Sequence, residues 1–422
     1  MALIARDADA VNPVIDLISK PSFETLHPVV YPVDRVHSPI SADMLTDLLQ
    51  YTDINGIIQN DVFMKAGNSK LVSTRALSCF DGGDVNLGTY TNLQSTLDHF
   101  LAGNASGNSP FERISLATQV GRTAAWLVGG DPSPMEDEFT TIWPRVTLIT
   151  FGEDDMAFPD LDHFANALLY AVDYALQRGS IPVIFSPVPC AGCPGGLEKS
   201  QQYRLLARSV AQYKQTPFVD LYLALDPLPN NGLGFDDIHM NTYNPGNMTP
   251  CFLTSQGLVF GYNTFNLLAL QVLDRLRKIL LQNEPAPDDD VELRIGSGSV
   301  AEPVVVSQFP FNDGNNLVSD GPDEVTDFDA CGFPDSTAGH EIVYRLDLNS
   351  PGSLRVDLVS IDDAALAVWL FQGGTSGENC IDGMHKLLEA EVAAGTWYLV
   401  VEAFVDEEET LDGEYLILID LQ

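Results

Sequence analysis

The sequence predicts an α/β domain built on a parallel sheet, followed by an all-β sandwich. In the first part of the chain, short apolar strands alternate with amphipathic helices, which is typical of a parallel sheet covered by helices on both faces. Beyond about residue 300 the strands become short and alternating, and Gly and Asp turns separate them. We therefore expect an α/β domain over residues 1–283 with an extended lead-in over 1–40, an acidic Pro/Asp linker over 284–299, and a sandwich over 300–422.

The expected helices follow from apolar spacing and from end signals. Ser41 is placed to cap the first of them. Phe164 and Leu168 belong to the apolar stripe of the third, and Gly179 ends it. These patterns predict helices over 41–49, 93–101, 161–177, 201–212 and 263–281.

The expected strands are short apolar runs that end in turn residues. In the α/β domain these runs cover 61–66, 146–151, 181–186 and 217–222. In the sandwich they cover 341–348, 353–358, 365–371, 396–403 and 414–421. Leu354, Val356 and Leu358 illustrate the sandwich pattern, because alternate residues of a strand point to the same face.

The charge balance restricts the partners of this protein. Its 422 residues include 21 basic and 59 acidic ones, which gives a net charge of −38. After Asn283, thirty acidic residues stand against four basic ones. Nucleic acids and anionic membranes would repel such a surface, so we exclude both as partners. A hydrophobic content of 45% suffices for the cores of roughly two or three domains. The sequence does not indicate an oligomeric state.

The cysteines and the start of the chain bear on the compartment. No apolar run is long enough for a transmembrane helix, so we expect no membrane insertion. The first residues lack the charged start and long apolar region of a signal peptide, so we expect either a cytosolic protein or a chain that begins after a removed signal. Six cysteines fit disulfides. Cys190 and Cys193 are the only close pair, and without a second such pair or a nearby histidine to complete a zinc site we expect a structural disulfide loop.

A serine lies at the turn that follows the first expected strand. Gly67 and Asn68 break the apolar run, and Ser69 comes next. A serine at such a turn is held by the sheet below and exposed above, where a nucleophile is useful, although the same residues also fill ordinary turns. Gly152 and Cys190 also follow strands. Because ligands of open parallel sheets bind at the carboxyl ends of the strands, we expect these positions to share one edge.

A second signal of serine-hydrolase chemistry follows the last strand of the sheet. Asp236 and His239 are spaced so that one loop can hold both, with the carboxylate orienting the imidazole. The imidazole could then take a proton from the Ser69 hydroxyl. Gly121 interrupts an otherwise helix-friendly stretch, which indicates a loop or a close backbone approach.

In these features the chain resembles the SGNH (GDSL-type) esterases and lipases over roughly residues 40–282. That family has four short blocks in order: a strand ending in Gly-Asp-Ser, a glycine that contributes its amide, Gly-x-Asn-Asp, and Asp-x-x-His. The matching positions are Gly67-Asn68-Ser69, Gly121, Gly152-Glu153-Asp154-Asp155, and Asp236 with His239. The resemblance implies a three-layer, flavodoxin-like α/β/α fold, with Ser69 as nucleophile, His239 as base, and the amides of Ser69 and Gly121 in the oxyanion hole.

Two positions depart from the family pattern. Asn68 replaces an aspartate, and Asp154 replaces the asparagine that donates a hydrogen bond to the oxyanion. An ionised aspartate cannot donate, and it repels the developing negative charge; loss of one such donor costs about 10²–10³ in rate. Burial could raise the pKa of Asp154 enough to keep it protonated as a third oxyanion donor.

Beyond about residue 300 the chain resembles the bacterial pre-peptidase C-terminal (PPC) sandwiches attached to secreted hydrolases, on features that include Cys331, Cys380 and the run 394–400. The resemblance implies an extracellular accessory domain for surface or polysaccharide attachment, with a disulfide between Cys331 and Cys380. By elimination, Cys79 and Cys251 would then pair. Acidic loops such as 320–329 could bind calcium, but the metal-ligand spacing of an EF-hand is missing, so we expect solvated loops and no required cofactor.

Two functions follow as hypotheses. The first is a secreted bacterial serine ester hydrolase acting on a small-molecule or polysaccharide ester through Ser69, His239 and Asp236, and weakened by Asp154. The alternative is a catalytically degenerate protein of the same fold that binds a glycan or a surface.

Overall fold

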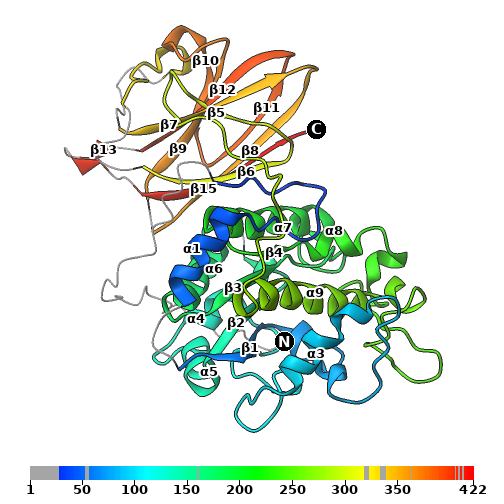
Figure 1. Cartoon of the computed structure of the whole chain (residues 1–422). Helices are drawn as coiled ribbons and strands as arrows, with labels where there is room; N and C mark the ends of the chain where they lie inside the picture. Colours follow the sequence, from blue (N-terminus) through cyan, green and yellow to red (C-terminus); the bar gives the residue numbers. More distant parts are fainter. Residues whose placement is uncertain are drawn as a thin grey trace. The chain divides into compact units, whose positions relative to one another are not determined.

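The computed structural model describes residues 28–52, 57–158, 161–317, 323–332, 339–362, 364–403, 405–406, 409–410 and 413–422. The contacts between residues divide the chain into two units (Figure 1). The first contains Val36–Arg204 and Thr216–Asp289. The second contains Leu205–Gln215, Asp290–Gln422 and the described part of Glu24–Arg35.

The first unit is built on a four-stranded parallel sheet. Its strands are β1 (Gln59–Gly67), β2 (Pro144–Thr150), β3 (Ile181–Phe185) and β4 (Phe218–Val219), and they lie in the order β1-β2-β3-β4. Residues on both faces of β2 and β3 are buried, since helices cover the sheet on both sides. The predicted parallel sheet is confirmed.

Two groups of helices flank this sheet (Figure 1). In one group α4 packs against α5 and α6, and α1 packs against α6; in the other, α3 and α8 pack against α9. The helices are α1 (Ala42–Thr52), α2 (Ser69–Val72), α3 (Gln94–Leu101), α4 (Ala124–Val128), α5 (Pro134–Ile142), α6 (Leu161–Gln177), α7 (Gly196–Tyr213), α8 (Leu221–Leu225) and α9 (Gly261–Leu281). The three-layer α/β/α arrangement is therefore as predicted.

The five predicted helices are present, and the helices α2, α4, α5 and α8, none longer than nine residues, were missed. Ser41 caps α1 by accepting a hydrogen bond from the backbone N–H of Met44 at 3.2 Å. Helix α5 is the longest that was missed, although Ser133 and Glu136 form a capping box around its first turn and Pro134 stands at its start. The sequence therefore contained the capping signal of α5, but the apolar pattern that follows it is too short to indicate a helix.

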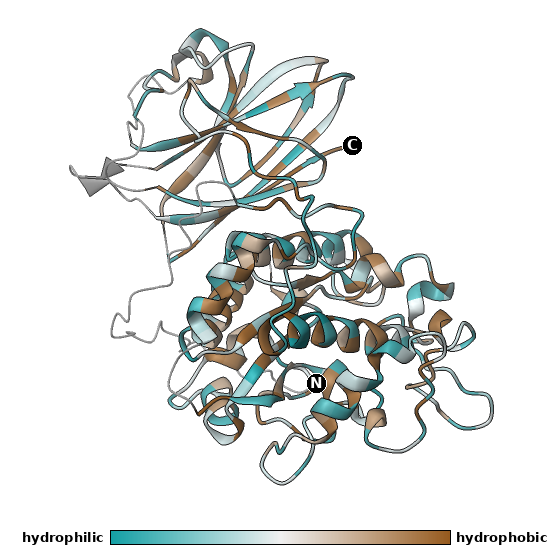
Figure 2. Cartoon of the chain, in the orientation of Figure 1, coloured by the Kyte–Doolittle hydropathy of each residue, from teal (hydrophilic) through white to brown (hydrophobic). Residues whose placement is uncertain are grey.

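The second unit is a sandwich of two antiparallel-rich sheets. Its strands are β5 (Val304–Val305), β6 (Phe311–Asn316), β7 (Glu341–Leu348), β8 (Gly352–Ser360), β9 (Leu366–Gln372), β10 (Cys380–His385), β11 (Leu387–Val392), β12 (Gly395–Ala403), β13 (Val405–Asp406), β14 (Glu409–Thr410) and β15 (Glu414–Leu421). One sheet has the order β10-β9-β12-β7-β5 and the other β11-β8-β15-β6, and β13 pairs with β14. Along several of these strands, hydrophobic and hydrophilic residues alternate (Figure 2). The predicted sandwich is confirmed.

Strand β6 was not predicted because it buries polar side chains on both of its faces. Asn312 is buried and donates to Ser209 Oγ at 2.7 Å. Asp313 is buried too, and its carboxylate accepts from Arg294 at 3.2 Å and from the Tyr344 hydroxyl at 3.1 Å. Hydrogen bonding thus satisfies polar groups where a sequence pattern would require apolar ones.

Some expectations lie outside the described residues. Residues 1–27 of the expected lead-in and residues 320–322 of the acidic loop are among them. Within the described part of the chain, no group of three or more His, Cys, Asp or Glu side chains is arranged to hold a metal ion. A search of the same residues finds no helix long and apolar enough to span a membrane.

Candidate active site

Ser69 lies where β1 gives way to α2. Gly67 is required at the end of the strand, because a Cβ there would stand 2.6 Å from the Thr150 hydroxyl and 2.8 Å from its carbonyl oxygen. Asn68 then caps the short helix α2, and its side-chain oxygen accepts from the backbone N–H of Lys70 at 3.3 Å. The neighbours of Ser69 on both sides are buried, while Ser69 itself is half-buried. A rigid turn therefore presents this hydroxyl at the carboxyl edge of the sheet.

Asp236 and His239 form the tip of a tight loop. Leu233 and Met240 pair across its base, and the backbone N–H of Gly234 donates to the His239 carbonyl at 2.8 Å. At the tip, His239 Nδ1 lies 2.7 Å from Asp236 Oδ2. A carboxylate can only accept, so Nδ1 carries the proton in this contact and Nε2 keeps its lone pair.

The Asp236 carboxylate is held in its charged form. Its slight burial pushes the pKa upward, but hydrogen bonds from the backbone N–H and the ring of His239, and from the backbone N–H of Ile238, lower the pKa to about 2. Asp236 Oδ1 accepts the two backbone N–H groups at 3.0 and 3.1 Å. The residue is therefore anionic at any pH at which a neutral imidazole exists, which is the arrangement that orients a histidine base.

Two disulfides support the loops at this edge. Cys190 and Cys193 are bonded, and within their loop the N–H of Gly192 donates to the carbonyl of Asp237 at 2.9 Å. The small disulfide loop thus packs against the Asp236–His239 tip. Cys79 and Cys251 form a second bond that joins the chain after α2 to the chain before α9. With Cys331–Cys380 in the second unit, all three expected pairings are present.

The segment with Gly121 lies beside the end of β1. The N–H of Gly67 donates to the carbonyl of Ala117 at 3.0 Å, and the N–H of Gln119 donates to the carbonyl of Gly67 at 3.1 Å. Gly121 has a φ of +73°, which explains why glycine stands there, and it is exposed. Its N–H makes no hydrogen bond to the other described residues, so it is available to an oxyanion.

Asp154 follows β2 and is half-buried. Its pKa is raised by burial and by the negative charge of Glu153, against the opposing effects of Lys70, of a hydrogen bond from Asn68, and of His239. The raised pKa favours the protonated form that could donate to an oxyanion.

The four sequence blocks therefore come together at one edge of the sheet. The Ser69 turn contacts the Gly121 segment through Gly67, and Lys70 binds Glu153. The loop of Cys190 and Cys193, which follows β3, binds Asp237. In the described part of the chain the Ser69 hydroxyl makes no hydrogen bond to His239, whose Nε2 also has no partner there. Such contacts are often loose without substrate. The assignment of Ser69, Asp236 and His239 as a catalytic set stays a prediction.

A buried ion pair behind Ser69 was missed in the sequence. Lys70 Nζ lies 2.6 and 2.8 Å from the two carboxylate oxygens of Glu153. The Asn68 amide also donates to Glu153 at 3.1 Å, and the backbone N–H of Val188 donates to it at 2.9 Å. Burial pushes the pKa of Glu153 upward, but Lys70 and the backbone N–H groups of Val188 and of Glu153 itself lower it overall. One feature of the sequence could have indicated this pair: Lys70 and Glu153 are oppositely charged, and each closely follows a buried strand.

Glu153 thereby ties together the turns after β1, β2 and β3, and its neutralisation is expected to destabilise the first unit. Glu153→Gln leaves the Lys70 ammonium buried without its counter-charge, and removal of one partner of such a pair lowers the free energy of unfolding by about 3–5 kcal/mol. Because the folded-state pKa of Glu153 is depressed, the stabilisation is present above its unfolded-state pKa and is lost as pH falls through the folded-state value. Urea unfolding followed by tryptophan fluorescence measures the change.

An exposed ion pair provides the matched control for this variant. Asp347 pairs with Arg345 at 3.0 Å, and the two side chains are 52% and 43% exposed. Asp347→Asn should therefore change stability by less than about 1 kcal/mol. The double variant Lys70→Met/Glu153→Leu should recover most of the loss by removing both charges together. A loss below about 1 kcal/mol for Glu153→Gln would contradict the role given to this pair.

Asp155 was recognised in the sequence, but its role in positioning the Gly121 segment was missed. Its carboxylate oxygens accept from the backbone N–H of Ala124 at 2.9 Å and from that of Gly152 at 3.0 Å. Burial raises the pKa of Asp155 to about 7, although these two donors oppose the shift. The residue fixes the start of α4, and hence the loop before it, to the turn that carries Asp154.

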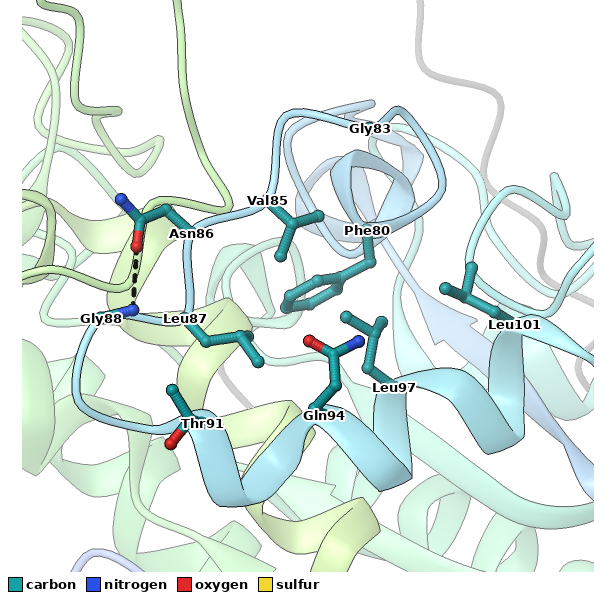
Figure 3. A pocket seen from close by; sticks show the side chains of 10 residues that line it. All are labelled: Phe80, Gly83, Val85, Asn86, Leu87, Gly88, Thr91, Gln94, Leu97 and Leu101. Atoms are coloured by element: carbon teal, nitrogen blue, oxygen red, sulfur yellow. Dashed lines mark hydrogen bonds between the residues drawn. The ribbon is translucent and has the colours of Figure 1, made fainter.

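A cavity in the first unit lies away from these residues. It encloses about 390 Å³ and is lined mainly by the chain after α2 and by α3. Figure 3 shows Phe80, Leu87 and Leu97 facing into it, and the Asn86 side chain turned back to the Gly88 N–H, from which it accepts a hydrogen bond at 3.0 Å. None of the four sequence blocks contributes to the lining, so the cavity does not identify the reacting centre.

The fold and the site define an α/β protein that carries the residue types of a serine hydrolase on one sheet edge, with a β-sandwich as a second unit. No protein-family model matches the sequence. No curated protein matches it either.

Esterases are among the solved structures similar to about half of this chain, and a PPC domain is similar to about a quarter of it. A catalytic mutant of an acetylxylan esterase from Geobacillus stearothermophilus is 16% identical, covers 52% of this chain and 96% of its own, and has a TM-score of 0.35. A GDSL-like lipase from Bacteroides thetaiotaomicron is 15% identical, covers 55% and 98%, and has a TM-score of 0.33. The pre-peptidase C-terminal domain of a collagenase from Bacillus anthracis is 16% identical, covers 26% and 89%, and has a TM-score of 0.19. They are of the two kinds that the sequence resembles.

Proposed function

We propose that this protein is a secreted carboxylic-ester hydrolase that uses Ser69, His239 and Asp236. The observation that carries the proposal is the contact of 2.7 Å between His239 Nδ1 and Asp236, which leaves Nε2 free to accept a proton. An ionised Asp236 and a half-exposed Ser69 on a rigid turn support it.

In this proposal the Ser69 hydroxyl oxygen attacks the ester carbonyl carbon while its proton passes to His239 Nε2. The carbonyl oxygen becomes an oxyanion, to which the N–H groups of Ser69 and Gly121 donate, and Asp154 is a third donor in the pH range where it is protonated. The C–O bond then breaks, and His239 returns the proton to the departing alcohol. A water molecule, activated by His239, cleaves the acyl-enzyme and releases the acid.

Three disulfides support secretion, because such bonds persist in oxidising compartments. Esters of small molecules or of polysaccharides are the proposed substrates. The second unit would be an accessory domain for attachment to a surface or polysaccharide, as its resemblance to PPC sandwiches implies.

Labelling with a fluorophosphonate tests this proposal directly. The reagent phosphonylates only a serine whose hydroxyl is activated by a base, so we expect one modified residue, Ser69, identified by peptide mass spectrometry. Ser186 is the internal reference, since its hydroxyl is buried and bonded to the Pro187 carbonyl at 3.1 Å. Absence of label on Ser69 between pH 5 and 9 would refute the proposal.

The alternative is a non-catalytic binding protein, and the half-buried carboxyl of Asp154 favours it. An ionised Asp154 would oppose the oxyanion that Ser69 creates. Binding of a glycan together with an unlabelled Ser69 would support this alternative.

A further inference from the structure

The loop that carries Asp236 and His239 is supported by a neighbouring segment. We call residues 234–239 the Asp-His tip. The side chains of Asp236 and His239 are 50% and 47% exposed, so packing alone holds them incompletely. Most hydrogen bonds of the tip join it to residues within the segment 230–241. Among the described residues, one N–H group bonds to the tip from outside that segment, and it belongs to Gly192.

Gly192 lies in the disulfide loop Cys190–Cys193 and contacts the backbone of the Asp-His tip. Its N–H donates to the carbonyl of Asp237 at 2.9 Å, and the Cys190 sulfur lies 3.6 Å from the same carbonyl oxygen. Asp237 has a φ of +55°, a conformation that is uncommon for residues other than glycine. The two contacts therefore hold the tip at a left-handed residue.

The disulfide loop is itself firmly anchored. Just before it, the N–H of Val188 donates to Glu153 at 2.9 Å, and the N–H of Cys190 donates to the Ser200 hydroxyl of α7 at 3.1 Å. The two cysteines have a sequence separation of only 3. A cross-link that closes so short a loop constrains the unfolded chain less than a long one does. Its main effect is therefore to fix the shape of the folded loop.

The absence of a side chain at Gly192 permits this approach. A Cβ at Gly192 would stand 2.6 Å from the carbonyl oxygen of Asp236 and 2.8 Å from Cγ1 of Ile238. Gly192 is exposed, and its φ lies outside the left-handed region. Neither burial nor backbone conformation therefore requires glycine at this position, whereas the close contact with the Asp-His tip does.

We propose that the Cys190–Cys193 loop positions His239 for the proton transfer from Ser69, and that Gly192 is the positioning residue through which the loop acts. This inference rests on the proposed ester hydrolase and adds a residue to its machinery. Gly192 takes no part in the proton transfers, because it acts on His239 through the backbone of the Asp-His tip. None of the four sequence blocks includes this loop.

The variant Gly192→Ala tests the proposal by displacing the Asp-His tip. The new Cβ meets the Asp236 carbonyl, a backbone atom that cannot rotate away, so the tip has to shift. A misplacement of about 1 Å costs about 10²-fold in rate, so we expect kcat for p-nitrophenyl acetate to fall at least about tenfold. KM should change less than about twofold, because the base assists only in the transition state.

The matched control is Gly82→Ala in the same unit. Gly82 is also exposed, and its φ also lies outside the left-handed region. A Cβ there would have an ordinary contact of 3.6 Å with the Cys79 carbonyl oxygen. This variant should keep the wild-type kcat and KM, and an unchanged thermal unfolding midpoint would verify that both alanine variants are folded.

Removing the cross-link provides a second variant that leaves Gly192 in place. In Cys190→Ala/Cys193→Ala the loop loses its fixed shape, so we expect kcat to fall at least about threefold while KM is retained. The control is Cys331→Ala/Cys380→Ala, which removes the disulfide of the second unit. That variant should keep the wild-type kcat.

Hydrogen–deuterium exchange followed by mass spectrometry tests the positioning without turnover. The N–H groups of Ile238 and His239 are bonded to Asp236 Oδ1 within the Asp-His tip. Exchange of such groups reports local opening. We expect the tip to take up deuterium faster in Gly192→Ala and in the Cys190/Cys193 variant than in the wild type, and Gly82→Ala to exchange as the wild type does.

The outcomes separate this inference from the proposed function. An unlabelled Ser69 together with faster exchange of the tip in Gly192→Ala would overturn the hydrolase and leave the support of the tip by the loop. A labelled Ser69 together with wild-type kcat and exchange in a folded Gly192→Ala protein would overturn the positioning role while the hydrolase stands. A raised KM at unchanged kcat would overturn that role too. If Gly192→Ala does not fold, wild-type kcat and exchange in the Cys190/Cys193 variant would overturn it.

Discussion

Replacing Ser69 by alanine is expected to lower the kcat for hydrolysis of p-nitrophenyl esters by several orders of magnitude. When the nucleophile and its base act as a unit, removing either one costs as much as removing both, up to about 10⁶-fold in kcat. In this protein the unit is Ser69 on the α2 turn and His239, held by Asp236 at 2.7 Å. The measurement is kcat for the single variants Ser69→Ala and His239→Ala and for the double variant.

The double variant tests whether Ser69 and His239 act in the same step. We expect its kcat to equal that of either single variant, because no step is left for the remaining partner to assist. His163, which lies in the first turn of α6 with its ring 5.8 Å from that of Phe158, provides the control histidine. His163→Ala should retain activity. A Ser69→Ala protein that hydrolyses the ester at the wild-type rate would refute the proposed mechanism.

The second large effect is expected from Asp154→Asn, which should raise kcat by about 10²-fold or more at neutral pH. The substitution restores a side-chain N–H donor where the ionised carboxylate would repel the oxyanion. The Asn68 amide, which hydrogen-bonds to Asp154, should accept the change. The Asn68 amide can donate to the side-chain oxygen of the introduced asparagine. In that orientation the N–H₂ group of the introduced asparagine points away from Asn68.

The pH dependence of this effect follows from the pKa of Asp154. Burial and Glu153 raise that pKa above its usual value. Below it Asp154 is protonated and can donate by itself, so the ratio of variant to wild-type activity should be smallest at acid pH. The ratio should grow as pH rises through the pKa of Asp154. A ratio near one at every pH would show that Asp154 does not face the oxyanion.

The fold could be predicted from periodicity because buried apolar patterns decided it. Helix α6 begins and ends at the predicted residues, Leu161 and Gln177, since an apolar stripe and a following glycine define both its face and its end. Strand β6 could not be predicted, because Asn312 and Asp313 are buried through hydrogen bonds to residues far away in the sequence. Local sequence does not contain such partners.

The same distinction between local patterns and distant partners applies to the candidate site. Ser69, Asp236 and His239 could be proposed from the sequence because their positions depend on local turns: a strand end for the first and one tight loop for the other two. The partners of Lys70 and Asp155 lie 83 and 31 residues away. Their roles therefore depend on how distant turns meet, which no local pattern encodes.

The Cys79–Cys251 bond has a consequence for the integrity of the chain. The two cysteines are 172 positions apart. Ser69 lies shortly before Cys79 in the sequence, and His239 lies shortly before Cys251. In the chain-entropy description, a cross-link that closes a loop of this length lowers the entropy of the unfolded ensemble and so stabilises the folded protein by about 5 kcal/mol. A protease that cuts the backbone once between Cys79 and Cys251 would therefore leave the segments of Ser69 and His239 in one covalent molecule. For a protein exposed to extracellular proteases, this cross-link would allow the two halves to remain associated after a nick.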